Sequence, residues 1–304
     1  MKSYFCTNRV LAWTFSSIAV TALFFACKKD AATKSTDPVT SNQNDNKVML
    51  AATHEGQVDV YYADVFSEVS EAAKQQGIQS AARQSNGDAA LQATTSCPSW
   101  SIDNVGPGWP KTVSINFGTS CASALTGRVR AGVINAVFSG PLLLAGSTVT
   151  VTFDNYKVNG LPVTGKIIYT MLGYNMVANG GVKYTQQIID GNIKLNDTVN
   201  IVYNHTKTVT QTAGGNTPAN PGDDEFDTDG TGTMAYKDAT GNTTATVALS
   251  TPIPLHTAWS CQYITKGQLK AVLNNLTAVI DYGNGTCDNL ATITVGDKTK
   301  QITL

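Results

Sequence analysis

The chain has 304 residues, a formal net charge of −1 and 14% charged residues, against about 25% in an ordinary soluble domain. It contains 26 glycines and is rich in Thr, Asn and Val. This composition disfavours a helical bundle or a coiled coil, which need Glu, Lys, Leu and Ala in quantity. It also disfavours a nucleic-acid partner, because there is no basic excess to contact phosphates. Composition therefore favours a β protein.

Residues 1–26 have the pattern of a secretory signal peptide. Lys2 and Arg9 make a short basic start, and residues 10–26 contain no charge, which is the order of such signals. The run is short for a membrane span, which needs about 20 apolar residues, so an uncleaved anchor helix is the less favoured alternative. The letters LFFAC at 23–27 resemble a bacterial lipobox. They predict cleavage before Cys27 and a lipid on Cys27.

The segment that follows the cysteine also resembles a known group. Cys27-Lys28-Lys29-Asp30 is similar to the start of many Bacteroidetes lipoproteins. The resemblance implies an outer-membrane lipoprotein of a Gram-negative envelope, exported to the cell surface where charged residues after the cysteine direct it there. The membrane, reached through the lipid on Cys27, is then the first expected partner.

Three segments are expected between Cys27 and the β region. Residues 27–57 are polar with few apolar groups, so we expect a flexible tether. Residues 58–77 carry an apolar stripe at helical spacing and predict one short amphipathic helix that ends near Gly77. Such a stripe is more often packed on its own domain than offered to a partner, and we favour packing. Residues 78–96 predict a linker. The stripe consists of Val58, Tyr62, Val65, Phe66, Val69 and Ala73.

Residues 97–304 predict one all-β domain. Val149, Val151 and Phe153 alternate with Thr, and Asn159-Gly160 follows, which is a strong signal for a β-hairpin. Strands joined by tight turns are antiparallel, so about a dozen of them predict a meander that forms either a sandwich or a partly closed barrel. The predicted strands are 127–138, 147–158, 160–171, 182–195, 199–211, 225–236, 243–251, 260–270, 276–282, 290–295 and 299–304.

Four cysteines remain outside the export signal, and an exported location predicts disulfides. The chain contains an internal echo, since Ser-Cys at Cys97 and again at Cys261 leads to Ile-(Asn/Asp)-aromatic-Gly and a further cysteine. The echo predicts the pairs Cys97–Cys121 and Cys261–Cys287, and the crossed pairings stay open. A zinc site is disfavoured, because no C-x₂-C or histidine cluster accompanies these cysteines.

The same motifs resemble a family. The sequences FGTSC, VTFDNYKVNG and IDYGNGTCDN, with ATITV and ITL near the end, are similar to Bacteroidetes envelope lipoproteins of comparable length. The resemblance covers most of residues 97–304. It implies an envelope location and a β domain, and it implies no particular activity.

An acidic run suggests a metal site. Asp223, Asp224, Asp227 and Asp229 lie close together with Glu225, and acids on a loop are ligands of Ca²⁺. The spacing does not follow the EF-hand register, and acids at every second position line the solvated face of a strand. We favour the solvated strand face and predict no metal and no other cofactor.

No catalytic constellation is evident, so we predict no catalytic residue. His54 falls in the tether, and His205 and His256 fall in strands, where we expect surface positions. No G-x-S-x-G nucleophile elbow occurs. A glycan-acting hydrolase with paired carboxylates is the enzyme alternative. Besides Glu225, its available acids are Asp103, Asp154, Asp190 and Asp281.

Tryptophans supply the binding candidates. Trp100, Trp109 and Trp259 lie near Cys97 and Cys261 and could stack on sugars or fill a partner pocket, although packing against a disulfide is the favoured reading. The sequence therefore predicts a lipid-anchored envelope protein with a non-catalytic β domain that binds or assembles with a glycan or an envelope protein. A carrier of an apolar ligand in a half-barrel is a further alternative.

Overall fold

The computed structural model describes residues 39–79, 97–104, 106–122, 127–174, 180–196, 199–217, 220–261 and 263–304. The predicted signal peptide, Cys27, the tether before residue 39 and linker residues 80–96 lie outside the described residues. The rest of the chain, Val39–Leu304, is one unit with its own core.

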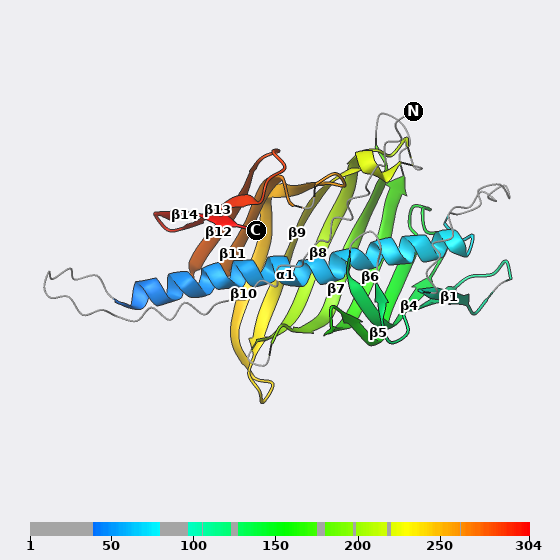
Figure 1. The fold of residues 1–304 in the computed structure, drawn as a ribbon, viewed down its shortest axis with the longest axis horizontal. Coiled ribbons are helices and arrows are strands. Elements are labelled where there is room, and N and C mark those ends of the chain that lie inside the picture. Colours follow the sequence, from blue (N-terminus) through cyan, green and yellow to red (C-terminus); the bar gives the residue numbers. More distant parts are fainter. Residues whose placement is uncertain are drawn as a thin grey trace, which may run out of the picture. The chain divides into compact units, whose positions relative to one another are not determined.

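One antiparallel sheet of fourteen strands makes up most of this unit (Figure 1). The strands follow chain order from β1 to β14, except that short β3 pairs with β4 off the main path. Within the described residues the strands form one sheet rather than a sandwich, and β1 and β14 are its two edges. The strands are β1 (Ser99–Ile102), β2 (Lys111–Asn116), β3 (Cys121–Ala122), β4 (Val129–Phe138), β5 (Thr148–Val158), β6 (Leu161–Tyr174), β7 (Val182–Lys194), β8 (Asn200–Ala213), β9 (Glu225–Lys237), β10 (Thr243–Ala258), β11 (Lys266–Leu273), β12 (Leu276–Asn284), β13 (Leu290–Val295) and β14 (Lys298–Thr303), with a 3₁₀ turn η1 (Pro221–Asp223) before β9.

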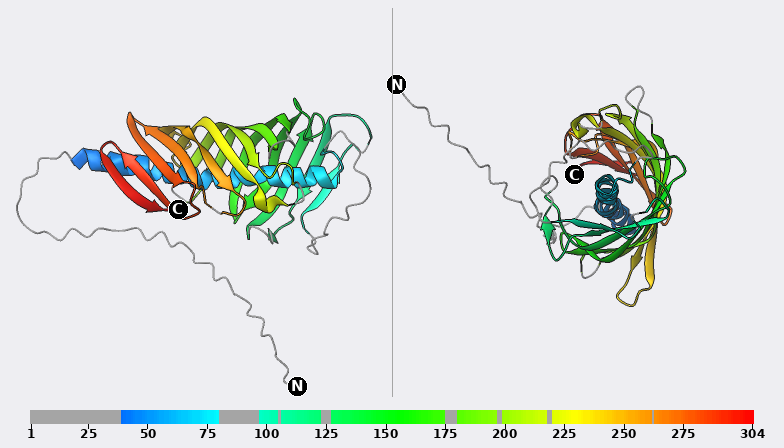
Figure 2. Two further views of the ribbon diagram at one scale, coloured as in Figure 1. Left: turned by 90° about the horizontal axis from the view of Figure 1, so that it is seen from above. Right: turned by 90° about the vertical axis from the view of Figure 1, so that its right-hand side faces the viewer.

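The sheet curls around a single helix, α1 (Val39–Gln75), which crosses the strands on the concave side (Figures 1 and 2). Register shifts bend the sheet, since β-bulges increase local twist and curvature. Four of these shifts fall at Gly132 in β4, Gly165 in β6, Asp190 in β7 and Gly267 in β11, and each of these residues has a positive φ. At Gly165 a Cβ would lie 2.6 Å from the Cα of Gly191. The bend therefore depends on strands that approach closely where side chains are absent.

The predicted tether over 27–57 and the predicted helix start at residue 58 are wrong in part. The helix begins at Val39 rather than residue 58, so residues 39–57 are helical. Its buried stripe extends backward at the same spacing, through Ala52, Ala51 and Val48. Most residues of this part are polar, and its buried apolar residues, two alanines and one valine, are small. The helical spacing therefore continues here, but the difference in hydrophobicity between the two faces of the helix is slight. The predicted stripe itself is confirmed as a packed face, because all its members are buried except the partly buried Phe66.

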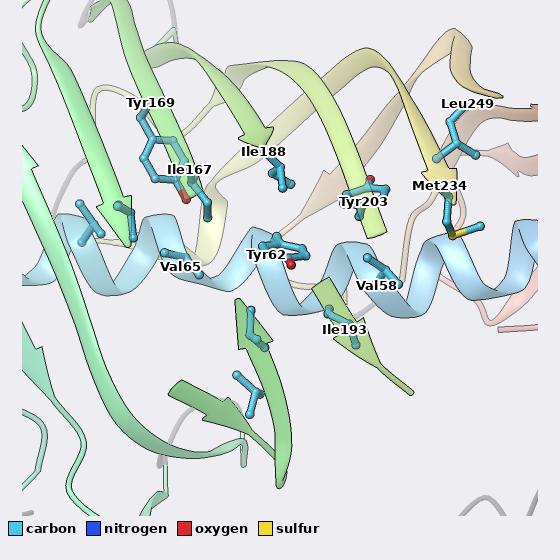
Figure 3. Packing of buried hydrophobic residues seen from close by; sticks show 14 of the residues in the cluster. Val58, Tyr62, Val65, Ile167, Tyr169, Ile188, Ile193, Tyr203, Met234 and Leu249 are labelled. Atoms are coloured by element: carbon cyan, nitrogen blue, oxygen red, sulfur yellow. The ribbon is translucent and has the colours of Figure 1, made fainter. Parts of the chain in front are cut away.

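The core lies between α1 and the concave face of the sheet. Val58, Tyr62 and Val65 of α1 meet side chains from β6 to β10 (Figure 3). The Tyr62 ring stacks near Tyr203 at 5.9 Å between centroids, and its hydroxyl donates a hydrogen bond to the Thr164 carbonyl at 2.9 Å. The facing residues shown in Figure 3 include Ile167, Tyr169, Ile188, Ile193, Tyr203, Met234 and Leu249.

Most of the predicted strands are confirmed, including the Asn159-Gly160 turn, where both residues have positive φ as a type I′ hairpin requires. The predicted strand 260–270 is wrong at its start, because β10 runs on to Ala258 and β11 begins only at Lys266. Linker residue Ile78 is also ordered, since its carbonyl accepts a hydrogen bond from the Leu142 amide at 3.0 Å.

We expect Gly165→Ala to destabilise the protein by about 2–4 kcal/mol, because it combines a strained positive φ with a backbone collision. Gly241→Ala is the matched control, since Gly241 also has a positive φ but nothing lies within 4 Å of its Cβ position. That change should cost only about 1–2 kcal/mol. Urea unfolding of both variants measures the difference, and equal losses would contradict the collision.

Candidate functional site: the charged groove around helix α1

The predicted disulfides are both formed. Cys97 bonds to Cys121 and Cys261 bonds to Cys287, with Cα separations of 5.8 Å in each pair. The first joins the chain before β1 to the start of β3, and the second joins the loop after β10 to the loop after β12. Each bond therefore links two neighbouring parts of the sheet covalently, as the repeated sequence pattern around the cysteines predicts.

The four calcium candidates do not converge on one point. Asp223 accepts a hydrogen bond from the Thr217 hydroxyl at 2.8 Å, and Asp224 accepts one from the Gln211 amide at 2.9 Å. Asp227 contacts His256 Nδ1 at 2.7 Å across the β9–β10 pair, and Asp229 lies farther along β9. Throughout the described ranges, no group of three or more His, Cys, Asp or Glu side chains is placed to hold a metal ion.

The acids available to a hydrolase are likewise spread over the sheet. Asp103 follows β1, Asp154 is in β5, Asp190 is in β7 and Asp281 is in β12. Glu225 and Asp227 do come together, because both contact His256, at 3.5 Å and 2.7 Å. All three of these residues are in cross-strand positions on the outer face of β9 and β10.

The three tryptophans also lie apart. Trp100 in β1 and Trp109 before β2 are partly buried against the core, and Lys111 Nζ lies 5.5 Å from the Trp109 ring centroid. Trp259, directly after β10, is 52% exposed. Packing therefore accounts for Trp100 and Trp109, and Trp259 stays a binding candidate.

Two histidines are not where the sequence predicts them. His54 lies within α1, and its Nδ1 is 2.9 Å from the Tyr236 hydroxyl in β9. His205 is 3% exposed on the concave face rather than on the surface, with Nδ1 buried and without a hydrogen-bond partner. Its ring packs against Gly230 and Gly232, where a Cβ would lie 2.4–2.8 Å from ring atoms. Burial lowers the pKa of His205 to about 4.

The concave groove holds two clusters of buried charge that the sequence prediction missed. In the first, Asp64 of α1 accepts a hydrogen bond from Arg130 Nε at 3.0 Å and pairs with Arg128 at 2.8 Å. Arg130 also reaches Glu68 at 3.1 Å. Burial opposes charge on Arg130, but Asp64 and Glu68 outweigh it and raise the pKa of the guanidinium. Burial raises the pKa of Glu68. Arg130 thus holds two acids of one helix face.

The second cluster lies where α1 crosses β8. Lys207 contacts Asp59, and the Tyr203 hydroxyl donates a hydrogen bond to Glu55 Oε1 at 3.1 Å. Burial lowers the pKa of Lys207 to about 8 against the opposing charge of Glu55. Burial raises the pKa of Glu55, although Lys207 and Tyr203 oppose the shift. A signal for these residues exists in the sequence, because Lys207 is in phase with the inward-facing Ile201, Tyr203 and His205.

These contacts fix the position of α1 in the concave groove. Acids of α1 pair with Lys207 of β8, with Arg130 of β4 and with Arg128 directly before β4. A further acid, Asp45, pairs with Lys298 of β14 at 3.0 Å. The pairs lie along the helix from its second turn to residue 68, among apolar contacts. Because α1 occupies the concave side, the open apolar groove required by the carrier alternative is largely filled.

Two small cavities lie near the β14 edge. One, of about 200 Å³, is lined by Asp281 and Asp288. Their carboxylates accept hydrogen bonds from the backbone amides of Gly283 and Leu290, each at 2.9 Å. The other, of about 430 Å³, lies between the start of α1 and the β13–β14 hairpin.

No family model, curated protein or solved structure matches the chain. Across the described part of the chain, no helix is both long and apolar enough to span a membrane.

Arg130→Met is expected to destabilise the protein by about 3–5 kcal/mol, because it leaves Asp64 and Glu68 buried without their cation. Arg128→Met is the control: Arg128 is 28% exposed, so its loss should cost about 1 kcal/mol or less. Adding Asp64→Asn and Glu68→Gln to Arg130→Met should recover part of the loss. Chemical denaturation measures the unfolding free energy of all three variants. Equal losses for Arg130→Met and Arg128→Met would contradict the claim that Arg130 is the cation that balances Asp64 and Glu68.

His205 should make the protein acid-sensitive. The unfolded chain protonates this residue below pH about 6.5 and the folded chain only below about 4, so folding stability should fall between these values. The loss should reach about 2–3 kcal/mol. His205→Phe keeps a ring against Gly230 and Gly232 and cannot titrate. Between pH 7 and pH 4, the unfolding free energy of His205→Phe should fall by about 2–3 kcal/mol less than that of the parent. An equal fall in both proteins would argue against His205 as the source.

Proposed function

We propose that this chain is a lipid-anchored protein of a bacterial envelope, held to the outer membrane by a lipid on Cys27, whose β domain binds or assembles with an envelope partner. The observation that carries the proposal is the N-terminal pattern: a basic start, an uncharged run over 10–26, and Ala26-Cys27 followed by Lys28. A lipid on the cysteine would anchor the protein, since each buried methylene contributes about 0.8 kcal/mol and several acyl chains together hold a folded domain at a bilayer.

The structure supports this proposal in two respects. Both disulfides belong to the β domain, and disulfides persist in oxidising compartments outside the cytoplasm. The described unit begins at Val39, so Cys27 precedes it by a short segment of polar chain. A lipid on Cys27 would hold the unit at the membrane without removing any residue of its core.

The described residues favour a binding role over the hydrolase. Of the acids that a hydrolase could use, Glu225 and Asp227 share His256. Asp281 lines a cavity with Asp288, and each of these carboxylates accepts a hydrogen bond from a backbone amide. The other acids with close partners mostly hold α1 or cap turns. The exposed ring of Trp259 and the polar outer face of the sheet are the surfaces such a partner would meet.

Cys27→Ala should abolish lipidation, because it removes the thiol that carries the lipid. Intact-mass spectrometry should show no acyl-modified chain, and the signal peptide should stay uncut. Cys6→Ala is the matched control, since Cys6 lies inside the predicted signal, and it should leave lipidation unchanged. Globomycin should block processing of the parent chain. A Cys27→Ala chain that is still cut after residue 26 and still held at the membrane would overturn the proposal.

A further inference from the structure

We propose that the cavity where β12 ends and β13 begins binds one neutral sugar ring of a glycan, and that Trp259 stacks on a second ring of the same glycan. The inference names the ligand class for the binding role proposed above and rests on that role. The cavity measures about 200 Å³, below the roughly 300–1,000 Å³ of drug-sized sites, so it has room for one small ring. The lining residues on which the argument rests are Asp281, Asn284, Thr286, Asp288, Leu290 and Gln301.

The polar wall of the cavity lies on the outer face of the sheet, on the side opposite α1. Asp281 directly follows the buried Ile280 in β12, so it points outward. It pairs with Thr292 of β13, which pairs in turn with Gln301 of β14, and residues directly opposite each other share a face of the sheet. Leu290 adds an apolar side chain that is 40% exposed. These side chains are open to solvent and free to meet a ligand.

The polar groups of the cavity include both acceptors and donors of hydrogen bonds. Asp281 and Asp288 are acceptors, and the Gln268 side-chain amide donates to Asp281 Oδ2 at 2.8 Å, which fixes that carboxylate in place. A carboxylate has about four lone-pair sites, so acceptor capacity remains. The exposed amides of Asn284 and Gln301 carry both donors and acceptors. A hydroxyl also donates and accepts, so a polyhydroxylated ligand matches this mixture, whereas an ammonium group would use only the acceptors.

The charge and the apolar part of the cavity restrict the sugar. Asp281 and Asp288 lie in the same cavity, and like charges at close range are unfavourable, so the site would repel a uronic acid or a phosphorylated sugar. Leu290 offers an apolar surface to the C–H face of a sugar ring, and covering that surface is favourable. A neutral hexose, which has hydroxyls around its edge and an apolar face, meets both conditions.

Trp259 lies close enough to contact a neighbouring ring. Its side chain is 52% exposed, and it lies two residues before Cys261, whose disulfide partner Cys287 is between Thr286 and Asp288 of the cavity. Three steps of about 3.8 Å along the chain and 5.8 Å across the disulfide place the Cα atoms of Trp259 and Asp288 at most about 17 Å apart. A short oligosaccharide spans this distance, and an exposed indole presents a large apolar face to it. The disulfide therefore keeps the two parts of the site together.

The test uses the chain from residue 28 onward without its lipid, because the described unit with its own core begins at Val39. Isothermal titration with neutral hexasaccharides of α-linked glucose, β-linked glucose and mannose should show saturable 1:1 binding of at least one, with a Kd below about 1 mM. Hexagalacturonate, which is acidic, should bind at least about tenfold more weakly. Hexalysine should not compete with the bound sugar.

Two variants locate the site, and each has a matched control. Gln301→Ala removes a hydrogen-bonding group of the cavity and Trp259→Ala removes the stacking ring, and each should weaken binding about fivefold or more. Gln187→Ala in β7 and Leu172→Ala in β6 remove exposed side chains elsewhere on the sheet, and both should leave the affinity within about twofold. Thermal unfolding checks that each variant is folded.

Three outcomes would overturn the proposal. The first is absence of saturable binding of all three neutral hexasaccharides by the parent chain. The second is an affinity of Gln301→Ala and Trp259→Ala equal to that of their controls. The third is displacement of the sugar by hexalysine, which would assign the cavity to a basic ligand. None of these outcomes depends on Cys27, so failure of sugar binding leaves the lipid anchor standing, and failure of lipidation leaves the sugar site standing.

Discussion

A single curled sheet leaves one broad apolar face that some other element must cover, and everything else in this structure follows from how α1 does so. The helix has 37 residues and a length of about 55 Å. The eleven strands that lie side by side from β2 to β13, without β3, have a similar width at about 4.8 Å spacing. The long helix thus matches the width of the meander, and each strand from β2 to β13 can place its inward residues near it. A short helix over residues 58–75 alone would leave much of that face uncovered.

Covering the face with an acidic helix has an electrostatic consequence. Asp59, Asp64 and Glu68 enter the groove, and buried charges are unfavourable unless paired. The sheet supplies Lys207 and Arg130 at the matching positions. Because these cations come from separate strands, a shift of α1 by one turn, about 5.4 Å, would separate several pairs together. Apolar contacts hold the helix in the groove, whereas the charged pairs define its register there.

This division explains what the sequence could and could not predict. The strands of β4 to β14 carry alternation and turn residues, which are local signals, so their positions were mostly predictable. The disulfide pairing was also predictable, because the echo around Cys97 and Cys261 reports a repeated local unit.

The parts that escaped prediction depend on contacts distant in sequence. Residues 39–57 are helical because Ala51, Ala52 and Val48 meet the sheet, and small or isolated apolar residues give little periodic contrast on their own. His205 is buried because Gly230 and Gly232, in the next strand, leave room for its ring. Lys207 is in phase with the inward-facing residues of β8, but no local pattern in the sequence shows that acids of α1 lie opposite Lys207 and Arg130.

The two edges of the sheet pose the remaining structural problem, because an edge strand has only one neighbour and exposes unpaired backbone groups. The Cys97–Cys121 bond closes a 24-residue separation near β1, and Cys261–Cys287 closes one of 26 residues near the opposite flank. Each is worth roughly 3 kcal/mol in the chain-entropy model, and both lie toward the ends of the strand order, where neighbours are fewest. At β14 the edge also carries Lys298 and Lys300, which discourage pairing with another strand. Lys298 also pairs with Asp45 of α1 at 3.0 Å. Protection of the edge and contact with the start of α1 therefore come from the same strand, so a sequence that kept the edge charged with acids instead would protect it equally and lose the pair with Asp45.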